Sequence, residues 1–329
     1  MLSRIRAALL RRAARRMAIS VVVVVYRMPE QADRTLHSLS RRYQRGLHDE
    51  PYEVIVVEND SDRRLGGAAV TRHGPEFRYY LRDDGARSPV PALDFGARQA
   101  RAPTIGLMID GARLVTPGIL RNVLRARRMA DVPVVSVPGY HLGREIQQEA
   151  VDSGYGPDVE MELLEGIGWP TDGYALFDIA CLSGSCAGGF FKPFAESNCL
   201  FMPRRFFFDI GGIDPAFDLP GGGNANLDLY RRACDDPRST LIVLPGEGSF
   251  HQFHGGVTTN RSKRSPERRR MMERLNEQYL RLRGEPYRAP GKSAVFLGEI
   301  PDQAQRFVAH SAEQARKDRE PEGSPEPGR

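Results

Sequence analysis

The chain has 329 residues, of which 40% are hydrophobic, and a formal net charge of +5. This apolar content can fill one large α/β domain or two smaller ones, so disorder is excluded as the overall class. The basic residues are mostly arginines dispersed along the chain, without an aromatic and basic platform, which argues against a nucleic-acid partner.

Cysteine spacing and the length of the apolar segments limit the cellular location. The four cysteines form no Cys-x-x-Cys pair and have no histidine at zinc-finger spacing: Cys181, Cys186, Cys199 and Cys234. The apolar run at 19–25 is far shorter than a membrane span. We therefore expect a cytoplasmic protein that does not cross a bilayer.

Residues 1–17 form a basic amphipathic segment. Leu2, Ile5, Leu9 and Ala13 share one helical stripe, and arginines surround it. Such a helix could lie on anionic lipid, so we expect peripheral contact with the inner face of a membrane. A solvated helix or a frayed terminus is the alternative.

From residue 18 to residue 137 the pattern alternates between apolar strands and helices. The expected strands are 19–26, 52–57, 77–81, 105–109 and 132–137. The expected helices are 29–43, 91–100 and 117–130. This alternation predicts an α/β layer fold with a parallel sheet, in which helical crossovers join buried strands.

The second part of the chain is less regular. Residues 139–189 are rich in glycines and acids, and we interpret them as a loop-rich insertion that shapes a pocket. Further on we expect strands at 197–202 and 240–244, the latter being the last strand, and a helix at 227–234. An exposed charged helix should cover 265–283, and the polar composition of 311–329 predicts disorder.

Polar residues follow two of the predicted strands. Glu58 and Asn59 come directly after the second strand, and Asp110 ends the strand that begins at Ile105. Ligands of α/β sheets bind beyond the carboxyl ends of the strands, so these side chains indicate a binding site. A polar β-turn is the alternative for the stretch that starts at Asn59.

His251 and His254 lie three residues apart after a strand, where both can face one ligand. We expect them to contact a metal or a diphosphate, with His254 preferred because glycines follow it. Core histidines bonded to backbone are the alternative. The stretch Gly291-Lys292-Ser293 looks like the end of a phosphate loop, but no strand precedes it, so ATP hydrolysis is not expected.

The order of these segments resembles family 2 glycosyltransferases of the GT-A fold over about residues 18–260. The resemblance implies an α/β fold with a mostly parallel central sheet and helices on both faces, followed by a C-terminal helix and a disordered tail. It divides the chain into the basic N-terminal segment 1–17, a nucleotide-sugar-binding half at 18–137, an acceptor-binding half at 138–262, and a charged helix with its tail at 263–329.

The implied activity is transfer of a sugar, with inversion, from a nucleotide-diphosphate donor to a glycan, lipid or small-molecule hydroxyl. Carried over from the family, Tyr26 and Arg27 form the wall beside the base, and Glu58 or Asn59 bonds uracil or ribose. Carboxylate and amide groups can make such bonds. The resemblance also implies a bacterial role in cell-surface polysaccharide biosynthesis.

The Asp-x-Asp motif of the family is matched only at its first acid. Ala112 stands at the second position and cannot ligate a metal, which makes a divalent cation such as Mn²⁺ or Mg²⁺ doubtful. Arg113 could offset the diphosphate charge instead. Asp110 is therefore assigned to hydroxyls of the ribose or sugar.

The expected general base is also replaced. Asn226 stands where the family has its catalytic aspartate, and an amide cannot take a proton at neutral pH. Asp228 and Glu196 are the remaining candidates, and a helix N-terminal acid and a solvated loop acid are the respective alternatives. The two replacements keep a rival hypothesis open, namely a non-catalytic protein of GT-A type that binds a nucleotide-sugar or a glycan.

Overall fold

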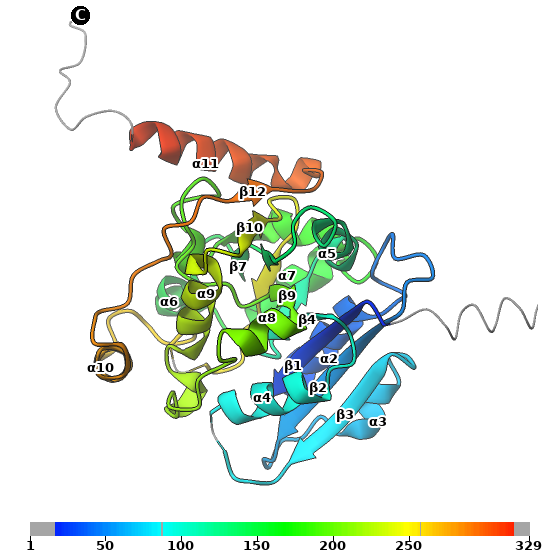
Figure 1. Cartoon of the computed structure of the whole chain (residues 1–329). Coiled ribbons are helices and arrows are strands. Elements are labelled where there is room, and N and C mark those ends of the chain that lie inside the picture. The colour runs from blue at the N-terminus through cyan, green and yellow to red at the C-terminus, as the bar shows by residue number, and fades with distance from the viewer. Residues whose placement is uncertain (1–16, 87, 257, 319–329) are drawn as a thin grey trace, which may run out of the picture.

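The computed structural model describes residues 17–86, 88–256 and 258–318 (Figure 1). The amphipathic stripe expected in residues 1–17 therefore lies outside the described residues. Among those described, no helix combines the length and the apolar character that a bilayer crossing requires. All four cysteines are free thiols.

A central sheet of eight strands runs through the molecule in the order β12-β10-β6-β9-β4-β1-β2-β3. Over the described residues, its pairings are parallel except for those of β9 with β4 and β6. The strands are β1 (Ile19–Val25), β2 (Tyr52–Asn59), β3 (Phe77–Arg82), β4 (Thr104–Met108), β6 (Pro133–Ser136), β9 (Leu200–Pro203), β10 (Thr240–Val243) and β12 (Val295–Phe296). The mostly parallel sheet confirms the predicted architecture.

Helices cover both faces of this sheet, and the valine run of β1 explains why. Val21 and Val23 pack into one core, with α2 (Pro29–Leu39), α3 (Gly67–Thr71) and α5 (Ile119–Ala126). Val22 and Val24 pack into the other core. The helices on that side are α4 (Val90–Gln99), α8 (Arg204–Asp209) and α9 (Ala225–Asp235). A strand with apolar side chains on both faces must be buried between two layers.

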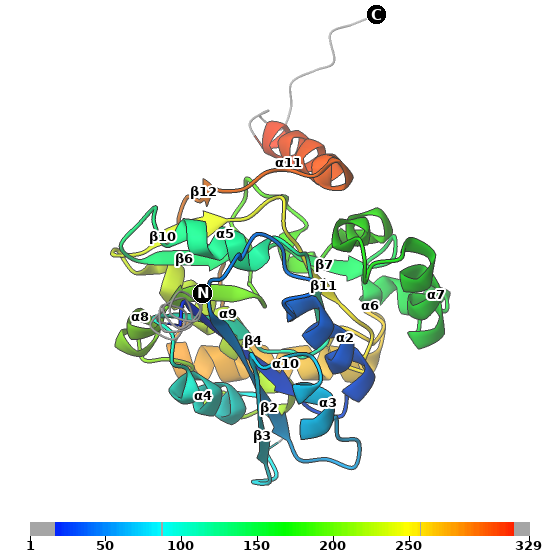
Figure 2. The ribbon, with the colours of Figure 1, turned by 90° about the vertical axis from the view of Figure 1, so that its right-hand side faces the viewer.

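A second, smaller sheet corrects the prediction that 139–189 is a loop-rich insertion and that 240–244 is the last strand. Its order is β5-β11-β7-β8. The strands are β5 (Arg113–Val115), β7 (Gly139–Leu142), β8 (Ala180–Leu182) and β11 (Ser249–His251), and the same region holds α6 (Gln147–Ala150) and α7 (Pro157–Ile167). Strands of three or four residues are too short to show a period in the sequence. Figure 2 shows α6 and α7 beside β7 of this sheet.

The last part of the chain contains two helices. The expected charged helix is α10 (Pro266–Arg283), and its N-cap Ser265 accepts a hydrogen bond from the backbone of Arg268. The disorder predicted from residue 311 is wrong for 311–317, because α11 (Gln305–Lys317) continues there. Phe307 and Ser311 form its buried face, and the backbone of Phe190 donates to Ser311 Oγ. Residues 319–329 are outside the described residues.

The sheet register places the candidate residues at one edge. Val25 pairs with Glu58 and Val23 pairs with Met108, so the parallel strands β1, β2 and β4 end together. Because β9 is antiparallel, its first residue Leu200 pairs with Leu107 near that same edge. The residues that follow β1, β2 and β4, and those that precede β9, therefore meet at the carboxyl edge of the sheet.

Candidate active site

Three side chains converge just beyond β4. Asp110 Oδ2 lies 3.0 Å from His251 Nε2 and 3.4 Å from His254 Nε2, and the two imidazole nitrogens are 3.2 Å apart. Asp110 follows the central sheet, whereas His251 ends β11 of the second sheet. Pairing of β11 with β5, which begins three residues after Asp110, brings the histidines to the carboxylate. The two histidines that we predicted to face one ligand thus lie beside each other and beside Asp110.

Gln147 fixes the orientation of His251. Its Oε1 atom lies 2.7 Å from His251 Nδ1, and its Nε2 atom donates to the His251 carbonyl at 3.0 Å. Asn260 also donates to Gln147 Oε1, so the oxygen of the amide is the atom that faces the ring. Nδ1 of His251 must then carry the proton, and Nε2 presents a lone pair toward Asp110.

A carboxylate on α7 completes this support. Glu160, buried on α7, accepts hydrogen bonds from the backbone of Phe253, from Tyr155 and from Gln147. Burial raises the pKa of Glu160. The loop that carries both histidines is therefore held from one side by residues of α6 and α7, which lie in the segment predicted to be loop.

The three ligand-type side chains differ in protonation. Burial lowers the pKa of His251 to about 4, in spite of the neighbouring Asp110. Burial also acts to lower the pKa of His254, but the charge and hydrogen bond of Asp110 outweigh it and raise that pKa above its usual value. For Asp110 burial is outweighed by the two histidines, which hold its pKa well below the usual range. A carboxylate and a neutral imidazole thus face each other here, and both are groups that can ligate a cation.

The geometry fits a divalent metal. Asp110, His251 and His254 each offer one ligand atom, and these atoms lie within 4.8 Å of one another. Metal bonds of about 2.0–2.2 Å to nitrogen and oxygen require neighbouring ligand atoms roughly 3 Å apart, as they are here. Ala112 is buried and takes no part. The histidines thus offer ligand atoms that Ala112 cannot, while the assignment of Asp110 to a cation or to sugar hydroxyls stays a prediction.

Arg113 lies beside this cluster. Its side chain is 7% exposed, and its Nε atom is 4.0 Å from Asp110 Oδ2. That nitrogen has no hydrogen-bond partner in the described part of the chain. In the register of the second sheet Arg113 faces His251 directly. A buried arginine with an unpaired donor next to the cluster adds positive charge where an anion would approach.

The other expected donor-binding residues lie at the same edge. They differ in how many of their polar side-chain atoms already have a hydrogen-bond partner. Glu58 is fully buried, and its carboxylate accepts from the backbone of Leu65 and Gly66 and from Tyr79. These bonds hold the loop after β2 in place. Asn59 is also buried, and it donates to the Ser88 carbonyl at 3.3 Å. Its side-chain oxygen is without a partner among the described residues.

Tyr26 and Arg27 follow β1 at this edge. Tyr26 is half-buried, whereas Arg27 is exposed and pairs with Asp62 at 3.0 Å. Arg27 has a φ of +57°, in the left-handed region that non-glycine residues seldom adopt. Such strained backbone is found preferentially at binding sites.

Of the expected catalytic residues, Glu196 and Asn226 are in contact. The Asn226 amide donates to Glu196 Oε2 and, at 2.9 Å, to the side chain of Asn198. Asn226 lies in the first turn of α9, and Glu196 lies in the segment before β9, at the carboxyl edge of the sheet. The amide at the position of the family aspartate thus holds a carboxylate from another segment.

Asp228 has a different environment. It is 1% exposed, and its carboxylate accepts from Arg232 at 2.8 Å and from Arg283 at 2.5 Å. Arg283 also pairs with Asp214 at 2.7 Å. Because guanidinium groups bond both carboxylate oxygens of Asp228, neither oxygen is available to take a proton from an acceptor hydroxyl. The residue joins α9 to α10 instead.

Sequence comparison gives no assignment: no protein-family model and no curated protein matches the chain. Solved structures do resemble it. S. aureus TarS superposes with a TM-score of 0.50 at 11% identity, covering 80% of this chain and 40% of TarS. S. aureus TarS 1-349 in complex with UDP-GlcNAc gives a TM-score of 0.50 at 13% identity, covering 80% of this chain and 67% of the other.

The chain thus spans less than half the length of full TarS. The shared architecture is a mostly parallel sheet between helical layers. The protein has a GT-A-like fold, the class of fold used by glycosyltransferases that take nucleotide-sugars, as the sequence predicted. Because the identities are only 11% and 13%, the comparison establishes the fold alone.

Proposed function

We propose that this protein is a glycosyltransferase that uses a nucleoside-diphosphate sugar and a divalent cation held by Asp110, His251 and His254. The observation that carries the proposal is the convergence of these three side chains at the carboxyl edge of a GT-A-like sheet. S. aureus TarS, which shares the fold, has been crystallised with UDP-GlcNAc, so UDP-sugars are the first donors to test.

The donor would bind along this edge. The unpaired Asn59 oxygen can accept a hydrogen bond from a base edge, and Tyr26 and Arg27 would flank the base. Glu58 acts by holding the loop on which the base rests, since its oxygens are already bonded. Arg113 would face the diphosphate from within the protein.

The cation would neutralise the charge that develops on the leaving diphosphate. Two imidazoles and one carboxylate favour a transition metal such as Mn²⁺ over Mg²⁺, which prefers oxygen ligands. Gln147 keeps the Nε2 lone pair of His251 directed to the site.

Glu196 is the candidate base. The acceptor hydroxyl would attack the anomeric carbon as the bond to the diphosphate breaks, and the hydroxyl proton would pass to the Glu196 carboxylate. A single displacement of this kind inverts the anomeric centre. Asn226 orients the carboxylate without competing for the proton. The acceptor class, whether a glycan, a lipid or a small molecule, is set by the surface around Glu196.

The test is a hydrolysis and transfer screen. Purified full-length protein is incubated with a panel of UDP-, GDP- and dTDP-sugars, with Mn²⁺, Mg²⁺ or EDTA, and release of nucleoside diphosphate is measured. Mn²⁺-dependent release from one donor supports the enzyme. Tight binding of a nucleotide-sugar without release under any condition would favour the non-catalytic binding protein.

Contact with an anionic membrane is proposed for the N-terminal side. The described chain begins at Met17, which lines a depression together with Arg101, Arg204 and Arg205. The Arg205 side chain is 93% exposed. These arginines extend the basic character of the preceding segment. Salt-sensitive co-sedimentation with anionic liposomes that disappears on deletion of residues 1–17 supports this role, and unchanged binding would contradict it.

A further inference from the structure

Glu196, Asn198 and Asn226 form a compact polar group at the carboxyl edge of the sheet. Glu196 and Asn198 lie in the segment before β9, whereas Asn226 lies in the first turn of α9. The side-chain amide of Asn226 donates to Glu196 Oε2 and, at 2.9 Å, to Asn198 Oδ1. One nitrogen atom thus joins the end groups of all three side chains.

These hydrogen bonds fix the orientation of both amides. A carboxylate only accepts hydrogen bonds, so the atom of Asn226 that faces Glu196 must be its nitrogen. The second hydrogen on that nitrogen requires an acceptor, so Asn198 turns its oxygen toward Asn226. The remaining polar atoms are therefore two acceptors, Glu196 Oε1 and Asn226 Oδ1, and one donor, Asn198 Nδ2.

The three remaining atoms are open to a ligand. None of them has a hydrogen-bond partner in the part of the chain that the structure describes. All three residues are half-buried, and none of these atoms is among the enclosed polar atoms without a partner. Water therefore reaches them, and a ligand that displaces this water has to supply matching donors and acceptors.

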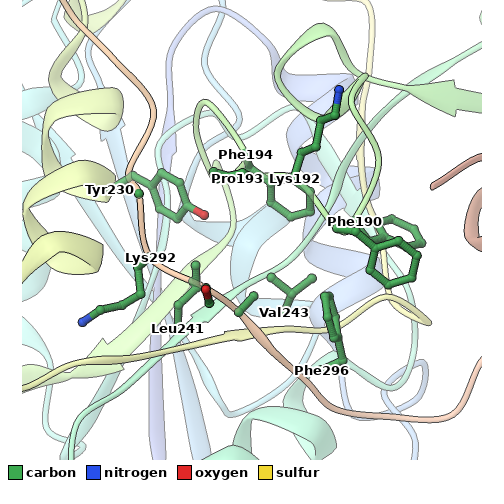
Figure 3. Close-up of a pocket in the computed structure, with 13 residues that line it drawn as sticks. Phe190, Lys192, Pro193, Phe194, Tyr230, Leu241, Val243, Lys292 and Phe296 are labelled. Atoms are coloured by element: carbon green, nitrogen blue, oxygen red, sulfur yellow. The ribbon is translucent and has the colours of Figure 1, made fainter. Parts of the chain in front are cut away.

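The segment that carries Glu196 and Asn198 is held firmly. The Tyr287 hydroxyl donates to the Ala195 carbonyl, and the Ala195 backbone donates to the Ser185 carbonyl at 3.0 Å. Phe194 is 2% exposed and lines a pocket of about 210 Å³ together with Tyr230 of α9 (Figure 3). The polar group is thus in place before a ligand arrives, which reduces the entropy lost on binding.

Two hydroxyls on adjacent carbons match the pattern of free atoms. Each hydroxyl can donate one hydrogen bond and accept others at its oxygen. One hydroxyl can donate to Glu196 Oε1, while its neighbour accepts from Asn198 Nδ2 and donates to Asn226 Oδ1. A simple alcohol leaves the two amide atoms to water. An ionised phosphate or carboxylate has no hydrogen to donate and is repelled by Glu196.

We propose that Glu196, Asn198 and Asn226 bind a vicinal diol of the acceptor, which makes the acceptor a sugar or another polyol. The hydroxyl on Glu196 would be the nucleophile, and the hydroxyl held by the two amides would position it. Asn198, which no sequence motif marks, then selects the diol. The inference rests on the proposed function, because it names the acceptor class for that active site.

Two isomeric probes test binding in the absence of any donor. cis-Cyclohexane-1,2-diol has adjacent hydroxyls and cis-cyclohexane-1,4-diol has separated ones, so the isomers differ only in spacing. Their affinities for the full-length protein are measured by ligand-observed NMR titration. We expect the 1,2-diol to bind about three- to tenfold more tightly, because it makes the additional hydrogen bonds to the amides. Equal affinity of the isomers, or binding of neither, would overturn the diol site.

Asn198→Asp tests the role of the Asn198 amide. The aspartate keeps an oxygen for the Asn226 amide but replaces the free donor with an acceptor, so the preference for the 1,2-diol should disappear. Asn276→Asp is the matched control, because it adds the same charge at an exposed position of α10 and should keep the wild-type preference. A preference that persists in Asn198→Asp would exclude Asn198 as the selecting residue.

Transfer assays then test the acceptor role. With the donor found in the screen, kcat/KM should favour the 1,2-diol over the 1,4-diol, and Asn198→Asp should remove this ratio. A change in the base affects both acceptors alike, so the ratio reports acceptor recognition. A diol preference in binding but not in transfer, in a protein that turns over its donor, would overturn the acceptor role. Absence of donor turnover contradicts the proposed function, while the binding comparison still decides whether this is a diol site.

Discussion

Gln147 Oε1 and His251 Nδ1 lie 2.7 Å apart although 104 positions separate them in the sequence. This contact connects the second sheet and α6 to the candidate metal site. It sets which nitrogen of His251 carries a proton and which nitrogen is a ligand. The effect of removing this hydrogen bond can be measured as a change in affinity for the metal ion, without any other ligand.

We expect Gln147→Leu to weaken Mn²⁺ binding by about 10- to 100-fold, the usual effect of losing the partner that orients a ligating histidine. Calorimetric titration of the full chain with Mn²⁺ measures this. Gln148→Ala is the matched control, because the side-chain oxygen of Gln148 has no partner among the described residues. Equal affinity in Gln147→Leu and in the control would show that the amide does not position the ligand.

Metal affinity should depend on pH through His254. The pKa of His254 is raised above 6.5, so this imidazole must lose a proton to bind a metal below that pKa. His251, with a pKa of about 4, is already neutral there. The Mn²⁺ association constant should therefore fall about tenfold per pH unit as pH drops below the pKa of His254. His254→Gln should bind more weakly at pH 8 and should lose most of this slope between pH 7 and pH 5. A slope retained in that variant would assign the proton to another group.

Arg283 should stabilise the fold through Asp228. Arg283→Met removes one of the two guanidinium groups that face this buried carboxylate. Because Arg232 remains, we expect a loss of about 2–3 kcal/mol in the free energy of unfolding, below the full cost of an unpaired buried charge. Arg281→Met is the control, since Arg281 is exposed in the last turn of the same helix and should change stability by less than about 0.5 kcal/mol. Urea unfolding of both variants measures the difference, and equal losses would mean that the ion pair adds nothing.

Glu196→Gln should lower the rate of sugar transfer by about 10²- to 10⁴-fold and leave donor binding intact. Asn226→Asp places a second carboxylate beside Glu196, and the like charges should raise the pKa that governs the transfer rate. The pH profile of transfer should then shift to higher pH. Asp228→Asn distinguishes Glu196 from Asp228 as the general base. We expect this substitution to lower the free energy of unfolding more than it lowers the transfer rate. A Glu196→Gln variant with wild-type transfer would exclude Glu196 as the base.

The sequence was sufficient for seven of the eight strands that the described residues form in the central sheet, because these strands are apolar and largely buried, whereas the two exposed residues of β12 gave no signal. The valine run of β1 and the apolar stretch of β2 show a buried parallel strand directly. From the strand ends we then predicted that Asn59, Asp110 and the two histidines contact a ligand, and this stays a prediction. The second sheet could not be predicted, because its strands have three or four residues and pair with segments far away in the chain.

The three candidate metal ligands were all named from the sequence, but Asp110 was assigned to hydroxyls of the ribose or sugar. No motif links Asp110 to histidines that follow it by 141 and 144 positions, and the pairing of β5 with β11 brings them together. Gln147 and Glu160 were missed entirely, since an amide or an acid in an irregular segment carries no pattern. Only Phe307 and Ser311 are buried on α11, so the apolar periodicity of this helix is weak. The charged residues around them made the segment look disordered. The division of the chain into two functional halves stays a prediction.

Binding of UDP measured with and without Mn²⁺ tests the central claim most directly. The wild-type chain should bind UDP in the presence of Mn²⁺ and lose at least about tenfold in affinity in EDTA or with Mg²⁺ alone. The variant Asp110→Asn should resemble the wild type in EDTA under all conditions. Equal affinity for UDP with Mn²⁺ and with EDTA, unchanged in Asp110→Asn, would contradict a nucleotide site built on Asp110, His251 and His254.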